Sequence, residues 1–284
     1  MRRLWRGVYV AREDWDALDE RERALLHLHA AQRASDRPLV FSHWSAALIL
    51  GLPVHHRYFG QAFVTVPPGG GRSMVGLRAR ALHLPDGAVI RRDGLLLTSH
   101  PRTVVDVIDA YGFTDGVMVA DAALHSLDAP RRPAAKLQML ESWDLAQPRR
   151  STVRVPLAIA FADGLSESAN ESRSRVTMHV LQVARPILQR EFFDTQGFIG
   201  RGDFYFEDED AIGEADGRSK ILDPRLNRGD PALVVLNEKR REDRLRADHR
   251  GFGRWEWEVS GSTARLAAVL ARMGVYPRRA VVRV

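Results

Sequence analysis

The segment Gly200–Lys220, GRGDFYFEDEDAIGEADGRSK, decides the fold of the second half of the chain. Two runs rich in apolar residues flank a short acidic stretch, which predicts two strands joined by a turn. Side chains alternate along a strand, so Glu214 and Asp216 share one face of the second strand. An antiparallel hairpin with so short a connection would bring Asp203 of the first strand beside Glu214.

Three crowded carboxylates are costly, because like charges raise each other's pKa unless a cation enters. Hard divalent cations prefer oxygen ligands, and Mg²⁺ is often held by one or two carboxylates together with substrate phosphates. The segment therefore predicts a metal site. The alternative is a solvated strand end whose acids pair with nearby arginines, such as Arg201 and Arg218.

Length and composition are those of a globular protein with two domains. The chain has 284 residues, 45% of them hydrophobic and 27% charged, and it has no cysteine. Disulfides and cysteine metal sites are thereby excluded. The first residues, MRRLWRGVYVARED, lack the apolar run of a signal peptide, and no segment approaches the length of a membrane span. We expect a cytoplasmic protein without a membrane partner.

The net charge of +6 favours a polyanionic partner such as DNA. Three of the 42 basic residues are lysines, Lys136, Lys220 and Lys239. An arginine-rich, alanine-rich composition also follows from a GC-rich coding sequence, which is the alternative explanation of the charge.

Periodicity along the chain predicts an α+β protein in two parts. The first part, 1–150, has a strand in RRLWRGVYV and then mixed helices and strands, with a helical linker to about residue 165. The second part, 166–284, shows the order α-β-β-β-α-β-α, with its last strand in RWEWEVS and its last helix in TARLAAVLARM.

Two helices of the second part carry further candidates. Glu171 lies in SANE, which matches the Ser-x-x-Glu capping box, so it either caps the helix or joins the carboxylates as a fourth acid. The segment NEKRREDRLRADHR carries Arg240, Arg241 and Arg244 beside the acidic strands. These arginines either contact phosphates or form a solvated helix face.

Other motifs are incomplete. PPGGGRS lacks the Gly-Lys-Ser/Thr ending of a phosphate-binding loop, and GLSES lacks the second glycine of a nucleophile elbow. No histidine pair has the His-x-x-x-His spacing of a helical zinc site.

The second part resembles the PD-(D/E)XK nuclease superfamily, and in it the small Vsr-like domains called DUF559. ESRSR, GRGDFYFED, GEADG and KRREDRLRADHRGFGRWEW carry this resemblance. It implies a restriction-endonuclease-like α-β-β-β-α-β core. By position, Asp203 and Glu214 would hold the metal and Glu171 would be the accessory acid of the helix. The family's lysine falls at Asp216, and Lys220 would supply the positive charge.

Residues 1–150 resemble AbiEi-type antitoxins of bacterial toxin–antitoxin systems, through RRLWRGVYV, FSHWSAALILGLPV, LLLTSHPRTVVDV and DAALHSL. In that family a winged helix-turn-helix precedes RGVYV, which forms part of the wing. Only four residues precede Trp5 in this sequence, so the resemblance implies a truncated winged-helix remnant. It also implies a cognate toxin as a possible partner.

Together these features predict an endodeoxyribonuclease that depends on Mg²⁺ or Mn²⁺, linked to a toxin–antitoxin or defence system. Asp203, Glu214, Asp216, Lys220 and Glu171 would form its site. A homo-oligomer is an open possibility. One alternative is a non-catalytic DNA-binding regulator or antitoxin with a degenerate nuclease domain. Another is a partner-binding protein that does not touch DNA.

Overall fold

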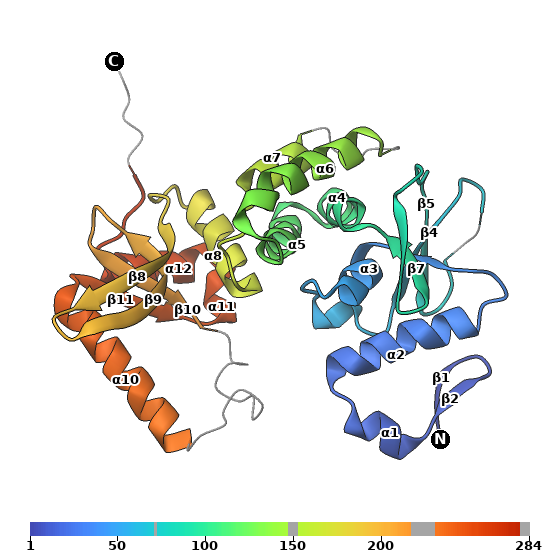
Figure 1. Ribbon diagram of the computed structural model, residues 1–284, viewed down its shortest axis with the longest axis horizontal. Helices are drawn as coiled ribbons and strands as arrows, with labels where there is room; N and C mark the ends of the chain where they lie inside the picture. Colours follow the sequence, from blue (N-terminus) through green and yellow to red (C-terminus); the bar gives the residue numbers. More distant parts are fainter. Residues whose placement is uncertain (71–72, 147–152, 217–230, 279–284) are drawn as a thin grey trace. The chain divides into compact units, whose positions relative to one another are not determined.

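The computed structural model describes residues 1–70, 73–146, 153–216 and 231–278, and the backbone alone for 231–235. The chain divides into two compact units, Met1–Gly164 and Leu165–Val284. Both units combine helices with mixed sheets, so the predicted α+β class is confirmed (Figure 1). No helix in the described ranges has the length and apolar character needed to cross a membrane.

Unit 1 begins with a hairpin rather than with the single strand expected for RRLWRGVYV. β1 (Arg2–Trp5) pairs antiparallel with β2 (Val8–Val10). The reversal occurs because Gly7 adopts a φ of 75°, which a residue with a Cβ rarely reaches.

A five-stranded sheet forms the centre of unit 1, in the order β5-β4-β3-β7-β6. Its strands are β3 (Val40–Phe41), β4 (Ala62–Val66), β5 (Leu77–Ala81), β6 (Val89–Arg92) and β7 (Leu95–Thr98). The pairs β3–β7 and β4–β5 are parallel, whereas β3–β4 and β6–β7 are antiparallel. The sheet is therefore mixed.

The helices of unit 1 are α1 (Arg12–Ala17), α2 (Glu20–Arg33), α3 (His43–Leu50), α4 (His100–Tyr111), α5 (Phe113–His125), α6 (Arg132–Asp144) and α7 (Arg154–Phe161). Short 3₁₀ turns, η1 (His56–Tyr58) and η2 (Ala129–Arg131), connect some of them. All eight residues of α3 are buried. The segment expected to be a linker forms α7, which packs against α4, α5 and α6 and so belongs to unit 1.

The described residues of unit 2 have the element order expected from the sequence, with one additional short helix. Its elements are α8 (Ala169–Val180), β8 (Ile187–Asp194), β9 (Gly197–Phe206), β10 (Ala211–Ala215), α10 (Pro231–Asp248), β11 (Gly251–Trp255), α11 (Trp257–Ser260) and α12 (Thr263–Arg272). The strand expected over RWEWEVS ends at Trp255, and the remainder forms the short helix α11. Arg173 lies over the Trp257 ring at 4.3 Å and donates to the Trp257 carbonyl, which holds α11 against α8.

The sheet of unit 2, in the order β11-β10-β9-β8, lies between two apolar layers. On one face, Phe204 and Trp255 pack with residues of α8 and α12. On the other face, Tyr205 and Ile212 pack against Leu245 of α10, which is fully buried. Alternation along β9 and β10 therefore places the acidic side chains on the face that α10 covers.

Candidate functional site

The β9–β10 hairpin brings the predicted carboxylates together. Ile212 lies opposite Tyr205 and Gly213 opposite Phe204, so the next pair along the ladder is Glu214 with Asp203. The backbone N–H of Ala215 donates to Asp203 Oδ2 at 2.8 Å, which fixes the Asp203 carboxylate at the end of the hairpin. The predicted neighbourhood of these two acids is confirmed.

Helix α8 and strand β11 hold the end of β10. The Asn170 side chain donates to the carbonyl of Asp216 at 2.9 Å, and the backbone N–H of Asp216 donates to the Trp255 carbonyl. The Trp255 indole donates in turn to Ser174 on α8. A Cβ at Gly213 would approach the Trp255 ring to 2.6 Å, so glycine is needed for this packing. Glu214 and Asp216 are therefore presented by a rigid strand end.

A cavity of about 1280 Å³ opens on this face of the sheet. Its walls include Asp203, Glu214 and Asp216 from the sheet and Lys239 and Arg240 from α10. The lining is mixed on both sides, because α10 also contributes Glu238, Glu242 and Asp243, and the sheet also contributes Arg201 and Arg254. Carboxylates can hold a cation, and basic side chains can contact phosphates. Such a combination therefore suits a substrate that carries phosphate groups.

Two arginines neutralise the buried Glu214. Arg241 Nη2 lies 2.8 and 3.0 Å from the two Glu214 oxygens, and Arg254 Nη2 lies 2.5 Å from Oε2. Both arginines also bind Glu238 at 2.7 Å, and Arg254 Nε lies 3.2 Å from Asp216. The acids therefore pair with arginines, as the alternative interpretation expected, and the partners are Arg241 and Arg254. Arg201, which we had considered for this role, pairs with Glu167 instead.

Burial and these contacts shift the pKa values of Asp216, Glu238 and Arg254. Burial raises the pKa of Asp216; the charge of Glu214 acts in the same direction and that of Arg254 opposes it. The hydrogen bond from Arg241 lowers the pKa of Glu238. Burial lowers the pKa of Arg254, but its hydrogen bond and ion pair with Glu214 raise it above the ordinary value overall. Arg254 thus stays charged, as a fixed cation among the acids.

The oxygen ligands suit Mg²⁺ or Mn²⁺ by their chemistry, and the guanidinium groups mark a place where positive charge is stabilised. The described side chains include no group of three or more acids or histidines already arranged to hold a metal ion. A cation at Glu214 would have to replace Arg254, Arg241 or both as its partner.

Glu171 lies in the first turn of α8 and contacts the cavity wall through Gln189. It is 2% exposed, and its backbone N–H donates to Ser168 as expected for an N-cap. Its Oε2 accepts from the backbone N–H of Glu167 and from the Gln189 side chain, both at 2.9 Å. Gln189 lines the cavity, so Glu171 stands one residue behind its wall.

The arginines predicted to contact DNA have different environments. Arg240 is exposed, whereas Arg241 is committed to Glu214 and Glu238. Arg244 binds Asp194 at 2.6 and 2.7 Å, and this hydrogen bond lowers the pKa of Asp194. Lys220 and Arg218 lie outside the described residues.

The sequence did not single out Arg254, Glu238 or Gln189. Glu238 stands three residues before Arg241, a helical spacing at which ion pairs form, so this contact had a local signal. Arg254 reaches Glu214 only through the parallel pairing of β10 with β11. Gln189 has a φ of 52°, which is strained for a residue with a side chain, and nothing in the sequence indicates it.

Comparisons with protein-family models, with curated proteins and with solved structures gave no match for this chain.

Proposed function

We propose that unit 2 is a metal-dependent phosphodiester hydrolase that acts on DNA as an endonuclease. The observation that carries this proposal is the meeting of Asp203, Glu214 and Asp216 in one large cavity that is also lined by basic residues of α10, among them Lys239 and Arg240. The resemblance to DUF559 domains supports the same function, since the strand and helix order of unit 2 is the one that it implies.

Each residue has a proposed role. Asp203 and Glu214 would hold Mg²⁺ or Mn²⁺, which when bound stabilises charge on a phosphodiester and lowers the pKa of a water molecule. Asp216 would assist, and its raised pKa suits a group that exchanges a proton. Glu171 would orient the Gln189 side chain at the cavity wall. Lys220 and the exposed Arg240 would attract phosphates.

A second candidate is a non-catalytic DNA-binding regulator or antitoxin with a degenerate nuclease domain. The double arginine pairing of Glu214 favours it, because the negative charge there is already balanced without a metal. The AbiEi-like features of unit 1 agree with this candidate, and a cognate toxin or a second copy of the chain is its proposed partner.

Supercoiled plasmid incubated with Mg²⁺ or Mn²⁺ distinguishes the two candidates. Asp203→Asn removes the charge but keeps an oxygen that accepts from Ala215, so the hairpin should remain folded. Asp208→Asn, at an exposed position in the turn after β9, is the matched control. We expect cleavage by the wild type and by Asp208→Asn and none by Asp203→Asn.

Equal cleavage by the wild type and Asp203→Asn would identify a contaminating nuclease and contradict the hydrolase. Absence of cleavage together with binding that weakens steeply with salt would favour the regulator. Absence of both would leave the partner-binding alternative.

A further inference from the structure

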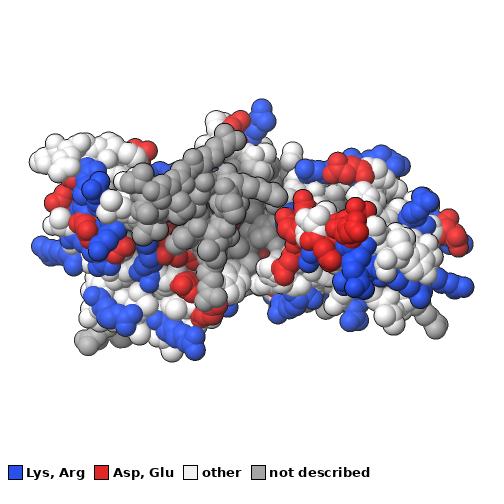
Figure 2. All heavy atoms as spheres, turned by 90° about the horizontal axis from the view of Figure 1, so that it is seen from below, with Lys and Arg blue, Asp and Glu red and all other residues white. Residues whose placement is uncertain are grey.

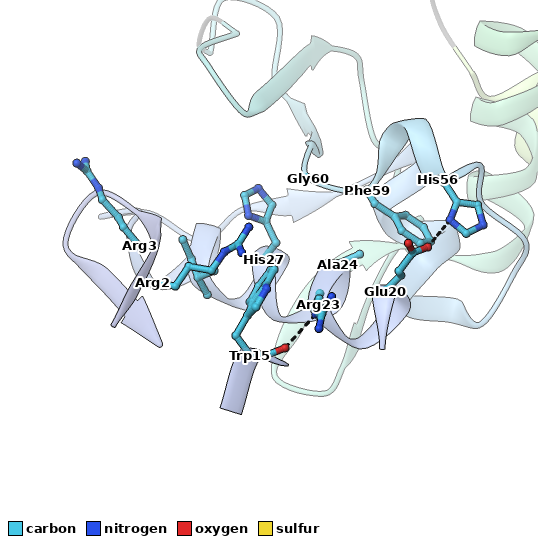
Figure 3. Close-up of a pocket in the computed structure, with 11 residues that line it drawn as sticks. Arg2, Arg3, Trp15, Glu20, Arg23, Ala24, His27, His56, Phe59 and Gly60 are labelled. Carbon is cyan, nitrogen blue, oxygen red and sulfur yellow. Dashed lines mark hydrogen bonds and ion pairs between the residues drawn. The ribbon is translucent and has the colours of Figure 1, made fainter. Parts of the chain in front are cut away.

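A second cavity, in unit 1, has a cationic and aromatic lining that the proposed function does not use. It measures about 450 Å³ and lies between β1, α1, α2 and the turn η1 (Figure 3). Figure 3 shows Arg2 and His27 toward one end, His56 and Phe59 toward the other, and Arg23 between them beside Trp15. A volume of this size falls within the range of roughly 300–1,000 Å³ typical of small-molecule sites.

The arginines of this cavity lack a carboxylate partner within the described part of the chain. Arg2, Arg3 and Arg23 form no ion pair with any carboxylate of the described residues. The one acidic residue in the lining is Glu20, and it is bound to His56 at 2.6 Å. Unpaired arginines that share one cavity repel each other, and an anion relieves that repulsion.

Stacking on an aromatic ring holds the Arg2 side chain in place. Its guanidinium lies over the Trp15 ring at 4.2 Å from the ring centre, and stacking of this kind leaves the N–H groups at the edge of the guanidinium available. Arg23 approaches the same ring at 5.4 Å and donates to the carbonyls of Trp15 and Asp16. Both Arg2 and Arg23 therefore lie near the Trp15 ring, whereas Arg3 points away from it in Figure 3.

His27 is a partly buried residue of the cavity wall. His27 Nε2 is shielded from solvent, and burial lowers the pKa of His27, an effect that a hydrogen bond with the Gly60 backbone opposes. Its ring is fixed at 5.0 Å from the Trp5 ring, and the Trp5 indole donates to the His27 carbonyl. The His27 ring is therefore a fixed part of the cavity wall.

The opposite end offers an aromatic surface. Phe59 is partly exposed and lies 5.1 Å from the His56 ring. A flat, apolar ring of a ligand can pack on such a surface. The cavity thus combines arginines suited to a phosphate with an aromatic face suited to a base, within a volume typical of small-molecule sites.

We propose that this cavity of unit 1 binds a free nucleoside phosphate, with the phosphate on Arg2 and Arg23 and the base toward Phe59. This site is separate from the carboxylate cavity of unit 2 and does not depend on the activity proposed for it.

The test is calorimetric titration of the full chain, tagged at its C-terminus, with AMP, adenosine, inorganic phosphate and a single-stranded oligonucleotide. We expect saturable binding of AMP and weaker binding of adenosine and of phosphate alone. Arg2→Gln should raise the Kd of AMP at least about tenfold, a loss of about 1.4 kcal/mol. Arg6→Gln removes the same charge from the same hairpin outside the cavity, and it should change the Kd by less than about twofold.

Arg23→Gln is the second variant, and its melting temperature is measured beside its affinity because Arg23 also holds the end of α1. A lack of AMP binding, or equal effects of Arg2→Gln and Arg6→Gln, would overturn the proposal. So would adenosine binding as tightly as AMP. Binding of the oligonucleotide without binding of AMP would assign the arginines to nucleic acid and overturn the small-molecule site.

Discussion

At the scale of single residues, Arg254 occupies the place that a divalent cation would take at Glu214. Arg254→Gln removes a charged hydrogen bond from a partly buried site, which costs about 1–3 kcal/mol. We expect the melting temperature without metal to fall by roughly 5–10 °C. Mn²⁺ should then raise it by more than in the wild type, because the cation no longer competes with the guanidinium.

Arg190→Gln is the control, since this arginine lies on the same sheet and pairs only weakly with Glu207 at 3.9 Å. It should respond to Mn²⁺ as the wild type does. Equal gains from Mn²⁺ in the wild type and in Arg254→Gln would mean that Glu214 binds no metal.

At the scale of elements, two arginines of α10 have different surroundings. Arg240 is exposed, whereas Arg244 is fixed by Asp194 of β8. In the proposed DNA complex Arg240 contacts a phosphate, so Arg240→Ala should lower the salt dependence of DNA binding by about 0.9 in the slope of log K against log salt. Arg244→Ala should mainly lower the melting temperature. Filter binding across salt concentrations and thermal melting give the two readouts.

Arg265→Ala supplies the control for the helix experiment. Arg265 is exposed on α12, which packs on the other face of the sheet, and its loss should leave the slope unchanged. A slope that falls equally for Arg240→Ala and Arg265→Ala would show that only net charge matters. Figure 2 shows basic and acidic side chains interspersed on the face that it presents, so net charge alone does not indicate where DNA would bind.

The elements also show how far the sequence alone determines the structure. Alternation over GRGDFYFED and AIGEADG was enough to predict the hairpin and the neighbourhood of Asp203 and Glu214, because both depend on local periodicity. The pairing of Glu214 with Arg254 was not predictable in this way. It requires the parallel register of β10 and β11, which a helix separates in the chain. The winged-helix remnant stays a prediction, since a two-stranded hairpin is compatible with many folds.

At the scale of the whole molecule, each unit has its own sheet and its own buried core. The apolar clusters around the unit 2 sheet consist entirely of residues after Gly164. Unit 1 has a separate core, to which α3 contributes all eight of its residues. Lengths of 164 and 120 residues, counted from the unit boundaries, are ordinary for domains that fold alone.

Residues 1–164 and 165–284 should therefore each fold when they are expressed separately. Each fragment should melt cooperatively, because it keeps its sheet and the helices that cover it. The sum of their circular dichroism spectra should match the spectrum of the full chain. As a control, the chain is divided after Asp128, within unit 1, into two fragments. That cut separates α4 and α5 from α6 and α7, which pack on them. Loss of cooperative melting in fragment 165–284, with folding restored on adding fragment 1–164, would contradict two independent units.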